Sequence, residues 1–170
     1  MQALGLVWRD VDPISPDCEE VSVAKDRPSH PGAQLIYRNW SEYREDGGLV
    51  VGRDLPSRAL AGVLRNLAVY EPVGGTADFR VRVAGTGLVR RYGCDVTGLP
   101  LSQIYEQHAF ERQRDLMTAI RNGARAFFDV DMVRAGRTEL QYESLFLPVR
   151  SPDLQQRWVL AGIFYHDWVR

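Results

Sequence analysis

The sequence of 170 residues has little of what several large classes of protein require. It contains two cysteines, Cys18 and Cys94, which lack metal-ligand spacing and are too few for a disulfide framework. It has no excess of positive charge, because 21 Lys and Arg face 22 Asp and Glu, for a formal charge of −1. Proteins that mainly bind nucleic acid or anionic membranes depend on such an excess. The composition therefore supports neither of these partners.

Long apolar segments are also missing. The longest nearly apolar run, Trp158–Tyr165, is far shorter than the roughly 20 residues of a membrane-spanning helix. Residues 1–10 have no basic flank ahead of an apolar core, so they do not resemble a signal peptide. We therefore expect a cytoplasmic protein without a membrane span. The 45% hydrophobic content is enough for a folded core, and the length predicts one domain.

The chain divides into an arm and a folded domain. Residues 1–32 hold four of the nine prolines and charges without a period, which predicts an irregular N-terminal arm with at most a short strand at Val21–Val23. Residues 33–170 form the expected single domain. Its first pattern, Ala33–Arg44, repeats apolar residues at helical spacing and predicts an amphipathic helix with a large aromatic face.

Strand patterns flank a helical middle section. Leu67–Tyr70 is an apolar run and Phe79–Val83 alternates apolar residues with arginines, so together they predict an antiparallel hairpin. The helices expected next are Leu88–Tyr92, a turn around Ser102–Tyr105, and the longer Ala109–Arg121. The last third predicts a three-stranded meander made of Phe127–Val133, Leu140–Val149 and Trp158–Trp168.

The last of these strands is apolar in both alternating sets of side chains. That pattern is expected only for a strand that is covered on both faces. The middle helices can cover one face of the sheet, and the helix Ala33–Arg44 is the natural cover for the other. The predicted fold is therefore α+β, with a five-stranded antiparallel sheet, helices that cup one face, and an N-terminal flanking helix.

Five pieces of sequence occur in an order that is hard to obtain by chance. They are Tyr37 with Trp40, then Leu55-Pro56-Ser57-Arg58, then the segments Phe79–Thr86, Gly93–Gly98 and Tyr142–Pro148. Together they resemble the family of small stand-alone PAS-like proteins common in alphaproteobacteria. The likeness covers about Gln34–Tyr165 and implies a PAS sheet. It also implies a sensory or protein-interaction module of bacterial signalling, and it supplies no catalytic residue.

A sheet cupped by short helices leaves a space that can hold a small apolar molecule. The inward-facing candidates are apolar or aromatic with a few polar tips, as in small-molecule sites, and are Tyr105, Met117, Ile120, Phe128, Tyr142, Ser144 and Phe146. The same residues serve equally well to fill an ordinary core. The candidate interface for a protein partner or a homodimer is the aromatic face with Tyr37, Trp40 and Tyr43.

Cofactor motifs are weak. Gly85-Thr86-Gly87 lacks the third glycine of a dinucleotide fingerprint, which would fall at Arg90, so we interpret it as a tight strand-to-helix turn. His108 is a candidate haem ligand, but it stands at the polar start of its helix, whereas an axial ligand should face the cavity from within the helix. Neither His30 nor His166 has metal-ligand spacing to another ligand type. No cofactor or metal is required.

The sequence thus predicts a non-catalytic PAS-type regulatory module that binds a small apolar ligand, a protein partner, or both. Two alternatives stay open. One is an acid–base isomerase or dehydratase on the cone-shaped fold of ketosteroid isomerases, with Asp95, Asp129 or Asp131 as the acid–base group. The other is a ligand-free adaptor with a filled core. The hairpin ahead of the middle helices favours the PAS order over the cone fold.

Overall fold

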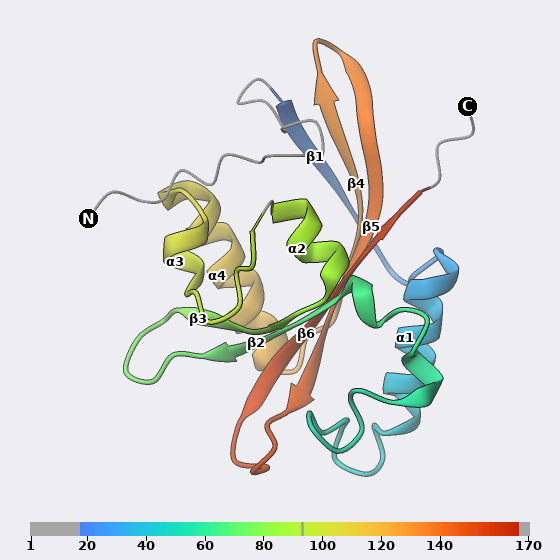
Figure 1. Ribbon diagram of the computed structural model, residues 1–170, viewed down its shortest axis with the longest axis vertical. Coiled ribbons are helices and arrows are strands. Elements are labelled where there is room, and N and C mark those ends of the chain that lie inside the picture. The colour runs from blue at the N-terminus through green and yellow to red at the C-terminus, as the bar shows by residue number, and fades with distance from the viewer. Residues whose placement is uncertain (1–17, 93, 167–170) are drawn as a thin grey trace.

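The computed structural model describes residues 18–92 and 94–166 of the chain. Its centre is an antiparallel sheet of six strands in the order β1-β4-β5-β6-β2-β3 (Figure 1). The strands are β1 Cys18–Lys25, β2 Leu67–Pro72, β3 Phe79–Ala84, β4 Ala126–Arg134, β5 Arg137–Arg150 and β6 Arg157–Tyr165. The helices are α1 Pro31–Glu42, α2 Thr86–Tyr92, α3 Leu101–Ile104 and α4 Gln107–Arg121, with 3₁₀ helices η1 Arg58–Leu60 and η2 Leu64–Asn66.

The predicted hairpin and meander are both confirmed. β2 and β3 pair antiparallel, and so do β4 with β5 and β5 with β6. The hairpin joins the meander through β2 and β6, with Val69 opposite Leu160. This pairing joins the five expected strands into one continuous sheet.

β1 corrects two predictions: the sheet has six strands and not five, and the arm through residue 32 is not irregular throughout. This strand pairs antiparallel with β4 from Cys18, opposite Arg134, to Lys25, opposite Phe127. Its apolar pattern is weak because one face stays open, with Val21 42% and Val23 59% exposed. An edge strand of this kind is held by backbone pairing to one neighbour, so it leaves little hydrophobic signal in the sequence.

Helices lie on both faces of the sheet (Figure 1). Side chains of α2, α3 and α4 share one core with Ala68, Val159 and Ala161 of the sheet. Side chains of α1 and of the segment that follows it share the other core with Leu145 and Leu160. Since neighbouring residues of a strand point to opposite faces, β5 and β6 contribute to both cores. The two cores explain why both alternating sets of side chains in the last strand are apolar.

The interface prediction is wrong for Trp40. Its side chain is 7% exposed, and its indole Nε1 donates a hydrogen bond to the carbonyl oxygen of Pro148 at 2.7 Å. The ring of Tyr37 stacks on Trp40 at a centroid distance of 5.9 Å and meets Phe127 edge-on at 5.2 Å. The aromatic face of α1 is therefore used inside the chain, against the sheet. An interface through the half-buried Tyr37 and Tyr43 stays a prediction.

Replacing Trp40 with alanine is expected to lower the free energy of unfolding by about 3–5 kcal/mol, because the change removes a buried ring and a hydrogen bond. Urea unfolding followed by circular dichroism measures this loss. Arg38→Ala, on the exposed side of the same helix, is the control and should change the stability by less than about 0.5 kcal/mol. Equal stability of the two variants would contradict the packing of α1 described above.

Candidate functional site

A cavity of about 570 Å³ lies between the sheet and the helices α2 and α4. Known small-molecule sites have volumes of roughly 300–1,000 Å³. The sheet supplies the floor of the cavity with Tyr70, Phe128, Val130, Met132, Tyr142, Ser144, Phe146, Ala161 and Ile163. The opposite wall consists of Leu88, Tyr92, Tyr105, Ala109, Arg112, Gln113, Leu116 and Met117, and β1 adds Glu20 and Ser22.

The structure brings six of the seven predicted ligand residues together around this cavity: Tyr105, Met117, Phe128, Tyr142, Ser144 and Phe146. Ile120 is the exception, because it is fully buried in the adjoining core and does not line the cavity. The lining residues of α4 run from Ala109 to Met117 at helical spacing. Ile120 stands almost one turn further along the helix, where side chains fill the space.

Several lining residues were not predicted from the sequence. Val130 and Met132 follow Phe128 at alternate positions of β4, so strict alternation would have found them. Ala109 and Gln113 precede Met117 by whole turns of α4, so helical spacing would also have found them. No sequence pattern marked Glu20 and Ser22 as lining residues, because the segment of β1 was interpreted as part of an irregular arm.

Formal charge is confined to one part of the cavity wall. Arg112 Nη2 lies 4.0 Å from Glu20 Oε1, and both side chains are well exposed, at 59% and 34%. This ion pair joins α4 to β1. The polar groups elsewhere in the wall are neutral, and they include the hydroxyls of Tyr92 and Tyr105, which lie 2.9 Å apart, and the buried Ser144. The interior of the cavity is therefore apolar, with a few uncharged hydrogen-bonding groups.

The turn at Gly85-Thr86-Gly87 positions α2 over the cavity. β3 ends at Ala84 and α2 begins at Thr86, so the interpretation as a strand-to-helix turn is confirmed. A Cβ atom on Gly85 would lie 2.5 Å from the carbonyl oxygens of Leu64 and Arg65. Only glycine permits this close approach of the turn to η2.

Residues named for other chemistries lie elsewhere. Asp129 and Asp131 share a face of β4 with Phe127, on the side of the sheet opposite the cavity. Asp95 and His108 are exposed and do not line the cavity. The acid–base alternative thus lacks its named aspartates in the cavity, and His108 is not placed to bind a haem there. In the described part of the chain no three His, Cys, Asp or Glu side chains gather as a metal site would require.

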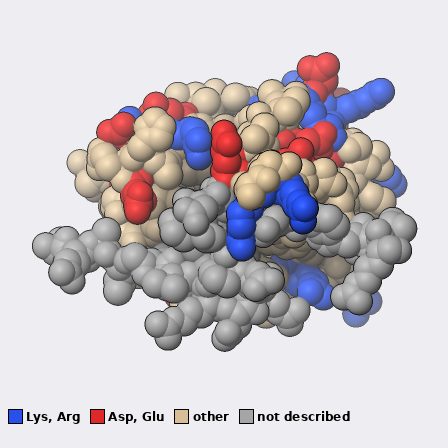
Figure 2. Space-filling view, turned by 90° about the horizontal axis from the view of Figure 1, so that it is seen from above, with Lys and Arg blue, Asp and Glu red and all other residues tan. Residues whose placement is uncertain are grey.

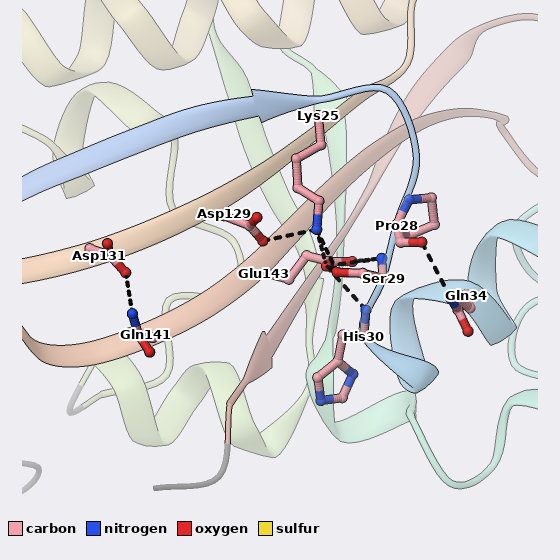
Figure 3. A network of polar contacts seen from close by, with 9 residues as sticks. All are labelled: Lys25, Pro28, Ser29, His30, Gln34, Asp129, Asp131, Gln141 and Glu143. Atoms are coloured by element: carbon pink, nitrogen blue, oxygen red, sulfur yellow. Dashed lines mark hydrogen bonds and ion pairs between the residues drawn. The ribbon is translucent and has the colours of Figure 1, made fainter.

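A polar network lies on the other face of the sheet, around Glu143 (Figure 3). The side chain of Glu143 is fully buried and accepts hydrogen bonds from Lys25 Nζ at 2.9 Å, Ser29 Oγ at 2.7 Å and the backbone N–H of His30 at 3.1 Å. Lys25 Nζ also donates to Asp129 Oδ1 at 3.0 Å. One carboxylate thus holds the end of β1 and the start of α1 against β5.

The network fixes the protonation state of Glu143. Burial by itself raises the pKa of this carboxyl group, but the hydrogen bonds from Lys25, Ser29 and His30 lower it, and the net pKa lies below the ordinary glutamate value. Burial alone lowers the pKa of Lys25, and its bonds to Glu143 and Asp129 raise it above the ordinary value. Both groups are therefore charged at neutral pH, as an ion pair requires.

One antiparallel sheet with helices on both faces and a cavity beneath α2 and α4 defines an α+β domain. A family model described as PAS domain matches residues 28–164, so the chain belongs to the PAS domain family. The resemblance drawn from the sequence is thereby confirmed. No curated protein and no solved structure matches the chain. The family match begins at Pro28, so β1 and its cavity residues Glu20 and Ser22 lie outside it.

The described part of the face seen from above is mixed in charge. Figure 2 shows Lys and Arg side chains interspersed with Asp and Glu on the face seen from above. This agrees with the near-neutral formal charge of the whole chain. Among the described residues, no helix is both long enough and apolar enough to cross a membrane.

Replacing Glu143 with glutamine should lower the free energy of unfolding at neutral pH by about 2 kcal/mol or more, because Lys25 loses its buried partner. Urea unfolding measures the change. Asp131→Asn is the control: Asp131 lies on the same face of the sheet and accepts an exposed hydrogen bond from Gln141. It should cost less than about 0.5 kcal/mol. Equal losses in both variants would contradict the role given to Glu143.

The stability difference between wild type and Glu143→Gln should also depend on pH. The folded-state pKa of Glu143 is lowered, so its contribution is complete above the unfolded glutamate value of about 4.3 and is lost as the pH falls through the folded pKa. We expect a constant difference from about pH 7 to about pH 5.5 and a narrowing difference below about pH 4. A difference that widens in acid would contradict the lowered pKa.

Proposed function

We propose that this protein is a PAS-type sensory module whose cavity binds a small, largely apolar ligand and whose state is passed to a protein partner. The observation that carries the proposal is the cavity of about 570 Å³ between the sheet and α4. Membership in the PAS domain family supports a sensory or regulatory role. The proposal includes no catalytic step.

The lining of the cavity favours a ligand over a filled core. Aromatic side chains such as Phe128 and Phe146 border the cavity, so they make fewer contacts with neighbouring protein atoms than the side chains of a packed interior make. Protein interiors otherwise pack as densely as organic crystals. A bound apolar molecule restores these contacts. An adaptor with a filled core would have no such space.

The strand β5 supplies a route from the cavity to the rest of the chain. Tyr142 and Ser144 line the cavity, and Glu143 between them holds Lys25 of β1 and the start of α1 on the opposite face. β1 itself contributes Glu20 and Ser22 to the cavity wall. A ligand that moves β5 or β1 therefore changes the contacts of β1 and α1 together. We propose this pair of elements as the output of the module.

The proposal is tested with the neutral dye N-phenyl-1-naphthylamine, whose fluorescence rises in apolar surroundings. Ala109 of α4 lines the cavity, so Ala109→Trp should fill part of it and weaken dye binding by roughly tenfold or more, since overfilled sites reject extra atoms. Ala119→Trp is the matched control, because Ala119 is exposed on the same helix. It should bind the dye like the wild type.

Two results would contradict the proposal. One is equal dye affinity in Ala109→Trp and Ala119→Trp, which would mean that the dye binds outside the cavity. The other is the absence of dye binding by a folded wild-type protein. Far-UV circular dichroism of each variant establishes that it has folded.

A further inference from the structure

One hydroxyl group stands in the middle of the apolar floor of the cavity. Ser144 lies opposite Phe128 of β4 and opposite Ile163 of β6, and all three line the cavity. Its neighbours on the same face of β5 are Tyr142 and Phe146. The Ser144 hydroxyl is therefore surrounded by large apolar or aromatic side chains.

The Ser144 hydroxyl has no partner within the described chain. The residue is 5% exposed, and in the ranges 18–92 and 94–166 its hydroxyl makes no side-chain hydrogen bond. Its oxygen is not one of the fully buried, unpartnered side-chain atoms of the described residues, so it opens onto the cavity that the residue lines. A serine hydroxyl that faces the cavity and makes no hydrogen bond within the described chain is free to bind a polar group of a molecule in the cavity.

The charge distribution limits what that molecule can be. The charged lining residues, Glu20 and Arg112, pair with each other and are both well exposed. Around Ser144 the wall offers apolar side chains and uncharged hydroxyls. A carboxylate or an ammonium group placed there would lose its hydration without an opposite charge, which is costly. The deep part of the cavity therefore suits an uncharged group.

Resting on the proposed function, we propose that the ligand is a neutral, largely apolar molecule with one hydroxyl or carbonyl group, and that Ser144 is the residue that recognises this group. A serine hydroxyl both donates and accepts hydrogen bonds, so it matches either group. The rest of the ligand is held by the aromatic floor and by Leu116 and Met117 of α4. Small side chains at Ser144 and Ala161 leave the space that the ligand occupies.

The test compares three probes of one size and different polarity: naphthalene, 2-naphthol and 2-naphthoate. Each displaces N-phenyl-1-naphthylamine from the wild type, from Ser144→Ala and from Thr118→Ala. Thr118→Ala is the control, because it removes an exposed hydroxyl of α4 that does not line the cavity. Unchanged naphthalene affinity in Ser144→Ala establishes that the cavity is intact in that variant.

In the wild type, 2-naphthol should bind roughly fivefold more tightly than naphthalene, and 2-naphthoate should bind at least about tenfold more weakly than 2-naphthol. Ser144→Ala should abolish the preference for 2-naphthol, and Thr118→Ala should retain it. The inference is overturned if 2-naphthoate binds as well as 2-naphthol, or if the preference survives in Ser144→Ala. Failure of all probes and of the dye to bind overturns the proposed function as well, whereas naphthalene binding without a hydroxyl preference overturns the ligand class alone.

Discussion

Successive side chains of β5 point to opposite faces of a sheet that is covered on both sides. Both the cavity and the attachment of α1 depend on this alternation. Tyr142, Ser144 and Phe146 form part of the cavity floor. Glu143 and Leu145, between them, anchor the start of α1 and its core. The cavity and the N-terminal elements are thus attached to the same strand, back to back. Neither can shift without moving the backbone that carries the other.

The two faces of β5 differ in chemistry. Glu143 is a buried charge with a fixed set of donors, and such a group tolerates little displacement because its desolvation is offset only by those bonds. The cavity face has apolar contacts and neutral hydroxyls, which accept a range of shapes. Under the proposed function, a ligand enters on the adaptable face, and the rigid face relays the movement of β5 to β1 and α1. This arrangement suits a sensory module of the PAS domain family.

The sequence predicted the parts of the fold that have strong periodicity. The hairpin and the meander followed from alternation along their strands. Four of the nine residues of the cavity floor were predicted as well, namely Phe128, Tyr142, Ser144 and Phe146. β1 was missed because backbone pairing to β4 holds it while Val21 and Val23 stay exposed, so burial leaves no pattern. Trp40 was assigned to an interface because a helix pattern reveals an apolar face but not what covers it. The unpartnered state of Ser144 depends on three strands together and has no local signal.

The central claim is that the space beneath α4 is the binding site of a small apolar molecule. The most direct test is a nuclear Overhauser experiment on the methyl-labelled protein with bound N-phenyl-1-naphthylamine. The account predicts contacts from the dye to the methyl groups of Leu88, Leu116 and Met117, which line the cavity. Contacts confined to the exposed Val21, Val23 and Val83 would show that the dye binds the outer surface, and would contradict the account.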